Sequence, residues 1–564
     1  MSELLKIVSS QYKNVIGRCD DTLDERTVRY ASMLKNDSFS FQALYRSEKE
    51  YEAVNMTACG DLPISAWRVD TVAVVSPRAT ECNAYEWDKA GLYPDILMPR
   101  PTAPQKTAVK NPWSHDLSRE KDTDNLLNAT NGTYQSVWFT VNPDGAELNA
   151  GKYEIKITLT DIRTPTSILG EESVIIEVLD ASLPEQTAYY TNWFHVDCVC
   201  HTFGVKPYSV GFYRIFDEYI ENMTAHRQNT LLLPAFTPPL DTGIGEERMN
   251  VQLVEIEKTD NGWSFSFNKM KKYIRHARQH GIKFFEHSHL FSQWGAEHAP
   301  NIYEKNGTRL FGFDTDASGE EYVGFIRSYL ADFLKFVKEE KIEKNVIFHI
   351  SDEPAARHLE SYRRDHDTVA DLLKDNLICD AMSDVVYYTE GLVNHPIFHV
   401  GHVTSEITEK CPTFWLYYTG GETDTANRKI SNTAAATRVL GVQMYRYNAR
   451  GFLHWAYNYY YDQLSYGFGS PASNPGIYKL FPGISYLCYP IFAKGKQTVV
   501  PSVREKLMAE AMDDLRALKL LESKIGREAT LALCEKHLGK IDTRNIPTGE
   551  ALRLLREEVN KKIL

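Results

Sequence analysis

The chain of 564 residues has no excess of basic residues, no long apolar run and no paired set of cysteines. Its nine cysteines, an odd number scattered over the whole length, do not form the disulfide framework of a small secreted domain. Lysine and arginine total 63 against 75 for aspartate and glutamate, a net charge of −12. This balance argues against nucleic acid and anionic membranes as partners. No segment approaches the ~18 apolar residues of a membrane span.

The first eight residues, MSELLKIV, lack the basic start and long apolar stretch of a secretory signal. If the protein begins where this sequence begins, we expect it to be cytoplasmic, with a substrate that is imported or made inside the cell. Hydrophobic residues make up 43% and charged residues 24%, which is typical of a folded globular protein.

The length indicates more than one domain, because single cores stop growing near ~250–300 residues. From about residue 25 to 180, segments of alternating apolar and polar residues are separated by turn sequences, for example at 64–75, 136–141, 153–159 and 174–179. This pattern predicts an all-β sandwich domain over residues 1–183. Residues 180–186 are a plausible linker, and 99–128 a long surface loop.

The pattern then changes to strands that alternate with helices. Eight candidate strands follow one another at 187–199, 230–236, 283–289, 345–351, 385–388, 397–400, 413–418 and 451–458. Helical spacing predicts helices at 213–227, 267–280, 322–338 and 355–374. We therefore predict an α/β (β/α)8 barrel, a TIM barrel, over residues 187–490. The rival, an open doubly wound sheet, lacks a glycine-rich fingerprint after the first strand. Residues 491–564 are predicted to form a C-terminal segment and helices that pack on the barrel.

Two adjacent acids, Asp352 and Glu353, directly follow the fourth candidate strand, and Pro354 comes next. A proline disfavours helical backbone angles in the residue before it and helps to end the strand. Neighbouring side chains within a strand point to opposite faces, so the two acids can converge on one ligand only where the strand stops. Barrel enzymes place their active sites at these strand ends. We therefore predict a catalytic pair, in preference to helix-entry charges opposite a basic residue.

Adjacent carboxylates suit the hydrolysis of 2-acetamido sugars. In most retaining glycosidases the acid and the nucleophile lie ~5–5.5 Å apart and flank the scissile bond, a placement that sequence neighbours rarely achieve. In substrate-assisted hydrolysis, the acetamido oxygen of the sugar itself attacks the anomeric carbon. Asp352 would then stabilise the amide nitrogen of the oxazolinium-type intermediate. Glu353 would protonate the leaving oxygen and later activate water.

Several segments resemble glycoside hydrolase family 123. They are 193–198 (WFHVDC), 236–242 (FTPPLDT), 284–294 (FFEHSHLFSQW), 313–317 (FDTDA), 349–354 (HISDEP), 451–455 (GFLHW), 482–483 (PG) and 500–504 (VPSVR). The resemblance covers about residues 190 to 525, and the N-terminal part is similar to the family only in general character. It implies a β-sandwich fused to a (β/α)8 barrel, the paired mechanism on Asp352 and Glu353, and N-acetylgalactosamine (GalNAc) as the preferred sugar. We expect a retaining exo-β-N-acetylgalactosaminidase whose partner is a GalNAc-containing oligosaccharide or glycolipid glycan.

The other strand ends carry polar and aromatic residues that suit a small polar ligand with flat apolar faces. We predict substrate contacts from His195, Asp197, His289, Gln293, Trp294, Tyr388, Tyr417, Tyr418, Trp455 and Asn458. A tyrosine that hydrogen-bonds the acetamido group would hold it in line for attack. Because the strand register is open, either Tyr417 or Tyr418 can face the pocket.

The segment 195–201 (HVDCVCH) has the residue types of a metal site. In a strand, however, His195, Asp197 and His201 would lie on one face and the two cysteines on the other, and the spacing matches no tetrahedral zinc signature. We predict no metal and no cofactor.

Two alternatives stay open. One is a carbohydrate-binding protein on a catalytically degenerate glycosidase barrel, against which the intact acid pair argues. The other is a conventional two-carboxylate retaining glycosidase that uses Glu353 with Glu286 or Glu390.

Overall fold

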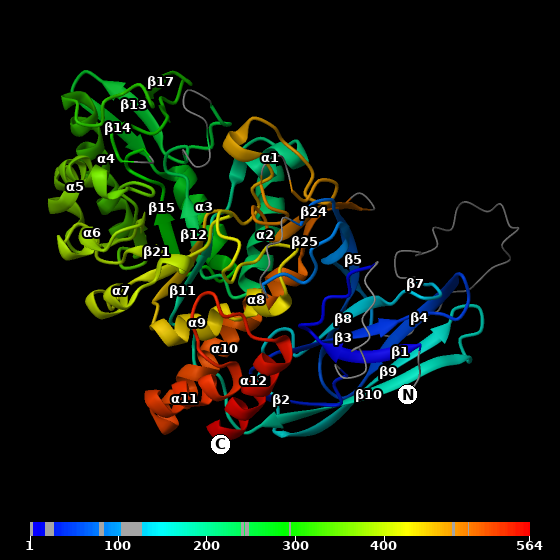
Figure 1. Cartoon of the computed structure of the whole chain (residues 1–564). Coiled ribbons are helices and arrows are strands. Elements are labelled where there is room, and N and C mark those ends of the chain that lie inside the picture. Colours follow the sequence, from blue (N-terminus) through cyan, green and yellow to red (C-terminus); the bar gives the residue numbers. More distant parts are fainter. Residues whose placement is uncertain are drawn as a thin grey trace, which may run out of the picture. The chain divides into compact units, whose positions relative to one another are not determined.

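The computed structural model describes residues 4–16, 27–77, 84–102, 127–238, 242, 247–292, 295–476, 480–493 and 496–564. The chain divides into two compact units. Unit 1 comprises Met1–Gln186, Ala426–Tyr445 and Val500–Leu564, and unit 2 comprises Thr187–Thr425 and Arg446–Val499. The N-terminal strands, drawn in blue and cyan in Figure 1, and the C-terminal helices, drawn in red, both belong to unit 1.

Unit 1 contains two five-stranded sheets. The first has the order β1-β3-β8-β5-β6 and is antiparallel throughout. Its strands are β1 (Leu5–Ser9), β3 (Phe39–Tyr45), β8 (Gln135–Val141), β5 (Ile64–Val74) and β6 (Gly91–Arg100). The second has the order β2-β10-β9-β4-β7, and only the β2–β10 pair is parallel. Its strands are β2 (Tyr30–Leu34), β10 (Ile168–Leu179), β9 (Gly151–Asp161), β4 (Glu52–Cys59) and β7 (Leu127–Ala129).

Both sheets of unit 1 contribute to one hydrophobic core. Alternate residues of β4, such as Val54 and Met56, are fully buried, and they pack in one cluster with residues of the other sheet such as Phe41 and Phe139. Burial of every second side chain is what the alternating sequence pattern predicts for sheets with one covered face. Most of the predicted surface loop at 99–128 lies outside the described residues.

Helices complete unit 1: α8 (Ala434–Arg438), most of α9 (Leu440–Tyr447), α10 (Val503–Ile525), α11 (Arg527–Leu538) and α12 (Gly549–Ile563). Arg504 on α10 forms an ion pair with Asp95 on β6 at 2.8 Å, and both side chains are completely buried. Glu557 on α12 accepts hydrogen bonds from the backbone and hydroxyl of Ser32 on β2. The C-terminal helices therefore pack against the sheets of unit 1. The division into 1–183, 187–490 and 491–564 stays a prediction.

Unit 2 contains two parallel sheets. One has the order β11-β23-β22-β21-β20 and the other β12-β15-β18-β19, and each hydrogen-bonded pair is parallel. The strands are β11 (Tyr189–Asn192), β12 (Thr230–Leu233), β15 (Phe284–His287), β18 (Val346–Phe348), β19 (Leu377–Ile378), β20 (Ala381–Met382), β21 (Ile397–His399), β22 (Trp415–Tyr417) and β23 (Gly451–His454). The facing edges β11 and β12 contact one another. Parallel strands direct all their carboxyl ends to one side, where residues from different strands can meet.

Helices α2 (Val210–Ala225), α3 (Asn268–Gln279), α4 (Glu320–Glu339) and α5 (Leu359–Leu373) separate these strands, close to where helical spacing predicts them. Two predicted strands differ from the structure. The strand predicted at 187–199 ends at Asn192, and α1 (Val196–Phe203) follows, so strand alternation does not apply to residues 195–201. A short apolar run with polar interruptions fits either structure by periodicity alone.

The strand predicted at 385–388 is wrong, because these residues lie at the start of the helix α6 (Val386–Thr389). The Asp384 carboxylate accepts a hydrogen bond from the Val386 N–H, which favours a helix start at this point. The strands in this part of the sheet are β19 and β20, which lie earlier and are only two residues long. No helix in the described part of the chain is long and apolar enough to cross a membrane.

Candidate active site

The acid pair lies beyond the carboxyl end of β18. The backbone N–H groups of Ile350 and Ser351 donate to the carboxylate of Asp380, which fixes the chain just before the pair. Glu353 then adopts a left-handed conformation with φ of 46°, unusual for a residue with a side chain. The strand itself ends earlier, at Phe348. The left-handed angle differs from the extended backbone that Pro354 favours, and it breaks the strand alternation, so the two acids need not point to opposite faces.

The two acids have different environments. Asp352 is half-buried and Glu353 is exposed. Burial, followed by the charge of Glu353, raises the pKa of Asp352 well above its usual value. Glu353 accepts a hydrogen bond of 3.0 Å from the hydroxyl of Tyr417, at the end of β22. Two carboxyls whose surroundings differ in this way can take different roles in acid–base chemistry.

Tyr417 and Tyr418 point in different directions. Tyr417 reaches Glu353, and burial followed by the charge of Glu353 raises its pKa. Tyr418 is completely buried, with its ring edge-on to Phe452 at 4.8 Å between centroids. Of the two tyrosines, Tyr417 is therefore the one that contacts the acid pair.

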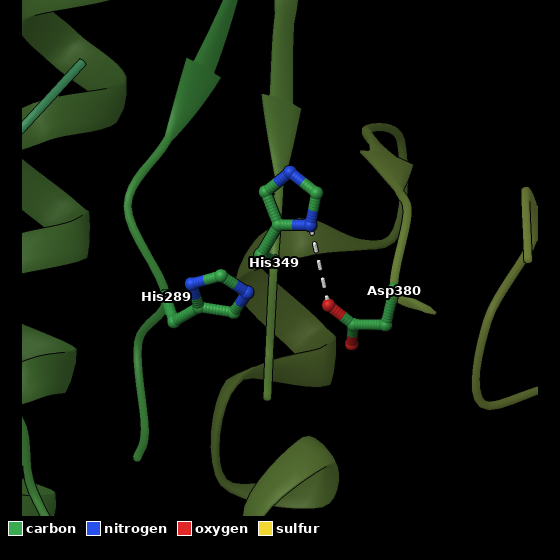
Figure 2. A group of neighbouring side chains, drawn as sticks. All are labelled: His289, His349 and Asp380. Carbon is green, nitrogen blue, oxygen red and sulfur yellow. Dashed lines mark ion pairs between the residues drawn. The ribbon is translucent and has the colours of Figure 1, made fainter. Parts of the chain in front are cut away.

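A buried charged cluster lies at the same strand ends. His349 follows β18, and its Nε2 lies 3.0 Å from Glu286 on β15, while its Nδ1 lies 3.4 Å from Asp380, which follows β19. Figure 2 shows the pairing of His349 with Asp380 and the neighbouring ring of His289. Burial opposes a charge on His349, but the bonds to the two carboxylates outweigh it and raise the pKa of His349 to about 9. His349 is therefore an imidazolium at neutral pH.

His289 has a different environment. Its buried ring lies edge-on to Trp193 at 5.5 Å and 5.0 Å from the ring of His349. Burial and the charge of His349 lower its pKa well below the usual value, so it is neutral. Its Nδ1 has no hydrogen-bond partner among the described residues. By contrast, His287 faces α4, where its Nε2 pairs with the hydroxyl of Tyr329 at 2.7 Å.

A cluster around Arg248 and the backbone of His195 joins three of the predicted contact residues, His195, Asp197 and Asn458. Arg248 holds both oxygens of Asp197 at 2.8 Å and donates to His195 Nδ1 at 3.1 Å. His195 Nε2 contacts the Trp455 carbonyl at 3.0 Å, and the backbone N–H of His195 donates to Asn458. Burial, then the charge of Arg248, lowers the pKa of His195 to about 3. This cluster secures the start of α1, and its role in substrate binding stays a prediction.

The remaining predicted contacts have varied positions. Tyr388 is half-buried on α6. Trp455 is half-buried after β23, stacked on His454 and edge-on to Tyr459. Gln293 and Trp294 lie outside the described residues.

Sequence reasoning missed the site residues His349, Asp380 and Arg248. For Asp380 a signal was present, since it is a lone acid that follows the apolar stretch 377–379. Asp380 follows β19, whereas the sequence pattern predicts the fifth strand at 385–388.

Two groups of donor atoms in the described parts of the chain lie within 4.8 Å of one another, the spacing needed to share an ion: His289, His349 and Asp380, and His399, His402 and Glu422. In the first group, carboxylates occupy both nitrogens of His349. In the second, Nε2 of His399 is 2.9 Å from Glu422, and His402 is largely exposed. Contacts within the chain thus engage the members of both groups other than His289.

Comparison with known proteins gives one family. Residues 193–521, more than half of the chain, match the family model described as glycoside hydrolase 123, catalytic domain. A similar solved structure is a family 123 glycoside hydrolase from Clostridium perfringens, studied for glycolipid glycan hydrolysis. It is 12% identical, with a TM-score of 0.70, over 99% of this chain and 97% of that one. No curated protein sequence matches the chain.

Other solved structures are less similar. A family 10 xylanase from Thermobacillus composti is 11% identical, with a TM-score of 0.29, over 58% of this chain and 97% of that one. A β-glucuronidase from Bifidobacterium dentium is 8% identical, with a TM-score of 0.31, over 90% and 66%. The family match confirms the resemblance that the sequence motifs indicate. The chain belongs to glycoside hydrolase family 123.

Proposed function

We propose that the protein is a retaining exo-β-N-acetylgalactosaminidase that acts by substrate-assisted hydrolysis, with Asp352 and Glu353 as its catalytic residues. The observation that carries the proposal is the asymmetry of this pair at one strand end. Asp352 is half-buried beside a charged cluster, and Glu353 is exposed and bonded to Tyr417. The ion pairs near the acid pair engage other carboxylates, Glu286 with His349 and Asp365 with Arg364.

The asymmetry suits the division of labour in this reaction. The acetamido N–H donates to Asp352, which stabilises the charged form of this carboxyl. A single proton held by the pair then resides on Glu353, from which it passes to the glycosidic oxygen as the C–O bond breaks. The acetamido oxygen forms the new bond to the anomeric carbon, which gives the oxazolinium. Glu353, now a carboxylate, takes a proton from the water that opens this ring and restores the β-anomer.

The rival with two protein carboxylates lacks a suitable second acid at either proposed position. Glu286 is completely buried and accepts hydrogen bonds from Thr191, Trp193 and His349. Glu390 is exposed at the end of α6 and pairs with Arg363. With both acids engaged elsewhere, the acetamido group of the substrate is the better candidate nucleophile.

The sugar and the fold of the proposal follow the family. The similarity to the Clostridium perfringens enzyme, studied on glycolipid glycans, supports a β-GalNAc-terminated glycolipid glycan or oligosaccharide as the substrate. We further propose that the nine parallel strands of unit 2, with the short β19 and β20 sharing one position, close into a (β/α)8 barrel, and that the sheets of unit 1 form a β-sandwich. The parallel pairings and the β11–β12 contact support the barrel, and the shared core supports the sandwich.

The experiment compares chromogenic β-glycosides that differ only at the sugar. We expect turnover of the GalNAc glycoside, slower turnover of the N-acetylglucosamine glycoside and none of the galactoside, which lacks the acetamido nucleophile. A thiazoline mimic of the intermediate should inhibit competitively, and NMR should detect the β-anomer as the first product. Equal rates on the acetamido and hydroxyl glycosides would refute substrate assistance. Binding of GalNAc without turnover would instead identify a degenerate, carbohydrate-binding member of the family.

A further inference from the structure

We propose that His349 is a positioning residue for the acid pair: clamped as a cation between Glu286 and Asp380, it opposes the burial and the like charges that favour protonation of Asp352, and so helps Asp352 to ionise as the oxazolinium forms. The inference rests on the proposed function, because it assigns Asp352 the task of stabilising positive charge. His349 itself touches neither substrate nor reacting atoms in this proposal.

The geometry of the clamp requires a charged ring. Both flanking groups are carboxylates, which accept hydrogen bonds when ionised, at 3.0 Å from Nε2 and 3.4 Å from Nδ1. A neutral imidazole has one N–H and would turn a lone pair toward one of the carboxylates, whereas an imidazolium donates to both. All three side chains are at most 1% exposed, so water cannot compensate a mismatch.

Each carboxylate of the clamp is anchored by neutral donors. On β11 and just beyond it, Thr191 and Trp193 donate to Glu286. Asp380 accepts from the hydroxyl of Tyr362 on α5 and from the backbone N–H groups of Ile350 and Ser351. Burial raises the pKa of Asp380, and the contacts with His349, Tyr362 and the Ser351 N–H oppose that shift.

Asp352 is coupled to this clamp through space and through the chain. The neighbouring carboxyls of Glu353 and Asp380 both raise the pKa of Asp352, because like charges repel. Among the described groups that act on the Asp352 pKa, His349 supplies the positive charge. Asp380 also bonds the two residues that precede Asp352, so the clamp fixes the backbone from which Asp352 projects.

The other groups around the clamp do not replace this charge. His289, which follows β15, is neutral, and Tyr417 on β22 hydrogen-bonds Glu353 as a neutral hydroxyl. The Cys379 thiol beside Asp380 is neutral because burial raises its pKa. Without the imidazolium, repulsion among the carboxylates would favour the protonated form of Asp352 more strongly. A protonated Asp352 would not stabilise an oxazolinium.

The test replaces the cation by a neutral donor in the full-length protein. In His349→Gln the amide still donates toward Glu286 but carries no charge. We expect kcat on the GalNAc glycoside to fall by about tenfold or more with little change in KM, and the acidic limb of the kcat/KM profile to move to higher pH by about one unit. His287→Gln is the matched control: it removes a buried histidine of β15 that faces α4, and the acidic limb should stay in place.

Glu286→Gln provides a second variant, because it weakens the hold on the cation without touching Asp352. The acidic limb should move in the same direction. A fall in kcat without any movement of the limb in both variants would overturn the proposal and leave His349 a structural residue.

A measurement on the wild-type protein does not depend on whether the variants fold. Selective ¹⁵N labelling of histidine should show one ring with both nitrogens protonated and slowly exchanging up to pH 8. Absence of such a ring would also overturn the proposal. Failure of the proposed function is separate, since it would show as equal wild-type turnover of acetamido and hydroxyl glycosides.

Discussion

The hydrogen bond from Tyr417 to Glu353 provides a sharp test of how the acid is held. Tyr417→Phe removes the hydroxyl that donates to Glu353 at 3.0 Å and leaves the ring, which is 9% exposed and packs in the core of the parallel strands. The change therefore removes one bond to the acid with little loss of packing. We expect a catalytic defect in a protein of nearly normal stability.

The magnitude follows from the kind of bond. Hydrogen bonds to charged groups contribute about 1.5–3 kcal/mol. Glu353 is exposed, so water takes over part of the interaction and the low end applies. A loss of about 1.4 kcal/mol in the transition state corresponds to a tenfold fall in kcat/KM.

The assay is the pH profile of kcat/KM on a GalNAc glycoside with a poor leaving group, for which acid catalysis matters most. Tyr273→Phe is the matched control. Tyr273 lies on α3, and the change removes a buried hydroxyl that donates to the Leu232 carbonyl at 3.4 Å. The control should keep the profile of the wild type. A Tyr417→Phe protein with unchanged kcat/KM at all pH values would show that the bond does not hold the acid for catalysis.

Four further predictions follow from the same contacts. Glu353→Gln should abolish turnover of glycosides with poor leaving groups but retain part of the turnover of activated aryl glycosides, measured as kcat on a leaving-group series. Asp352→Asn should lower kcat on every member of that series, and wild-type kcat would contradict its role. The pKa of His349 is raised to about 9, because the two carboxylates outweigh burial. The contribution of this proton to the free energy of unfolding is therefore fully present below about pH 6.5 and is lost as the pH rises through 9. The free energy of unfolding of His349→Gln, measured with denaturant, should therefore depend less on pH. Arg504→Leu removes the arginine from the buried ion pair with Asp95, and we expect a loss of about 3–5 kcal/mol in the free energy of unfolding by denaturant, part of which Asp95→Leu in the same protein restores.

The position of the acid pair was predictable because its signals are local. An apolar run, two acids and a proline within ten residues define a strand end without any knowledge of the partners. The helices α2, α3, α4 and α5 were predictable for the same reason, because their apolar spacing repeats over several turns. The strand predicted at 187–199 is too long and the fifth strand is misplaced, because apolar spacing over only a few residues does not distinguish a strand from a turn of helix.

The charged cluster could not be predicted, because it depends on register. Glu286 pairs with Ile347 across β15 and β18, which places Glu286 and His349 on the same face of the sheet. Phe348 pairs with Ile378 across β18 and β19, and Asp380 then falls beside Ile350. Glu286 lies 63 positions from His349, and Asp380 lies 30 positions from Ile350. A shift of one residue in either pairing would turn the carboxylates away from His349.

The left-handed conformation of Glu353 explains how one strand end can supply both acids. In a continuing strand, Asp352 and Glu353 would point to opposite faces, and a second strand would have to supply the partner carboxylate. The φ of 46° rotates Glu353 out of that alternation, and Tyr417 from β22 then fixes its direction. A backbone of this kind costs of order 1–3 kcal/mol and persists where the surroundings hold it. Here the Asp380 carboxylate accepts hydrogen bonds from the N–H groups of Ile350 and Ser351. The buried cluster that acts on the charge of Asp352 therefore also supports the turn that positions Glu353.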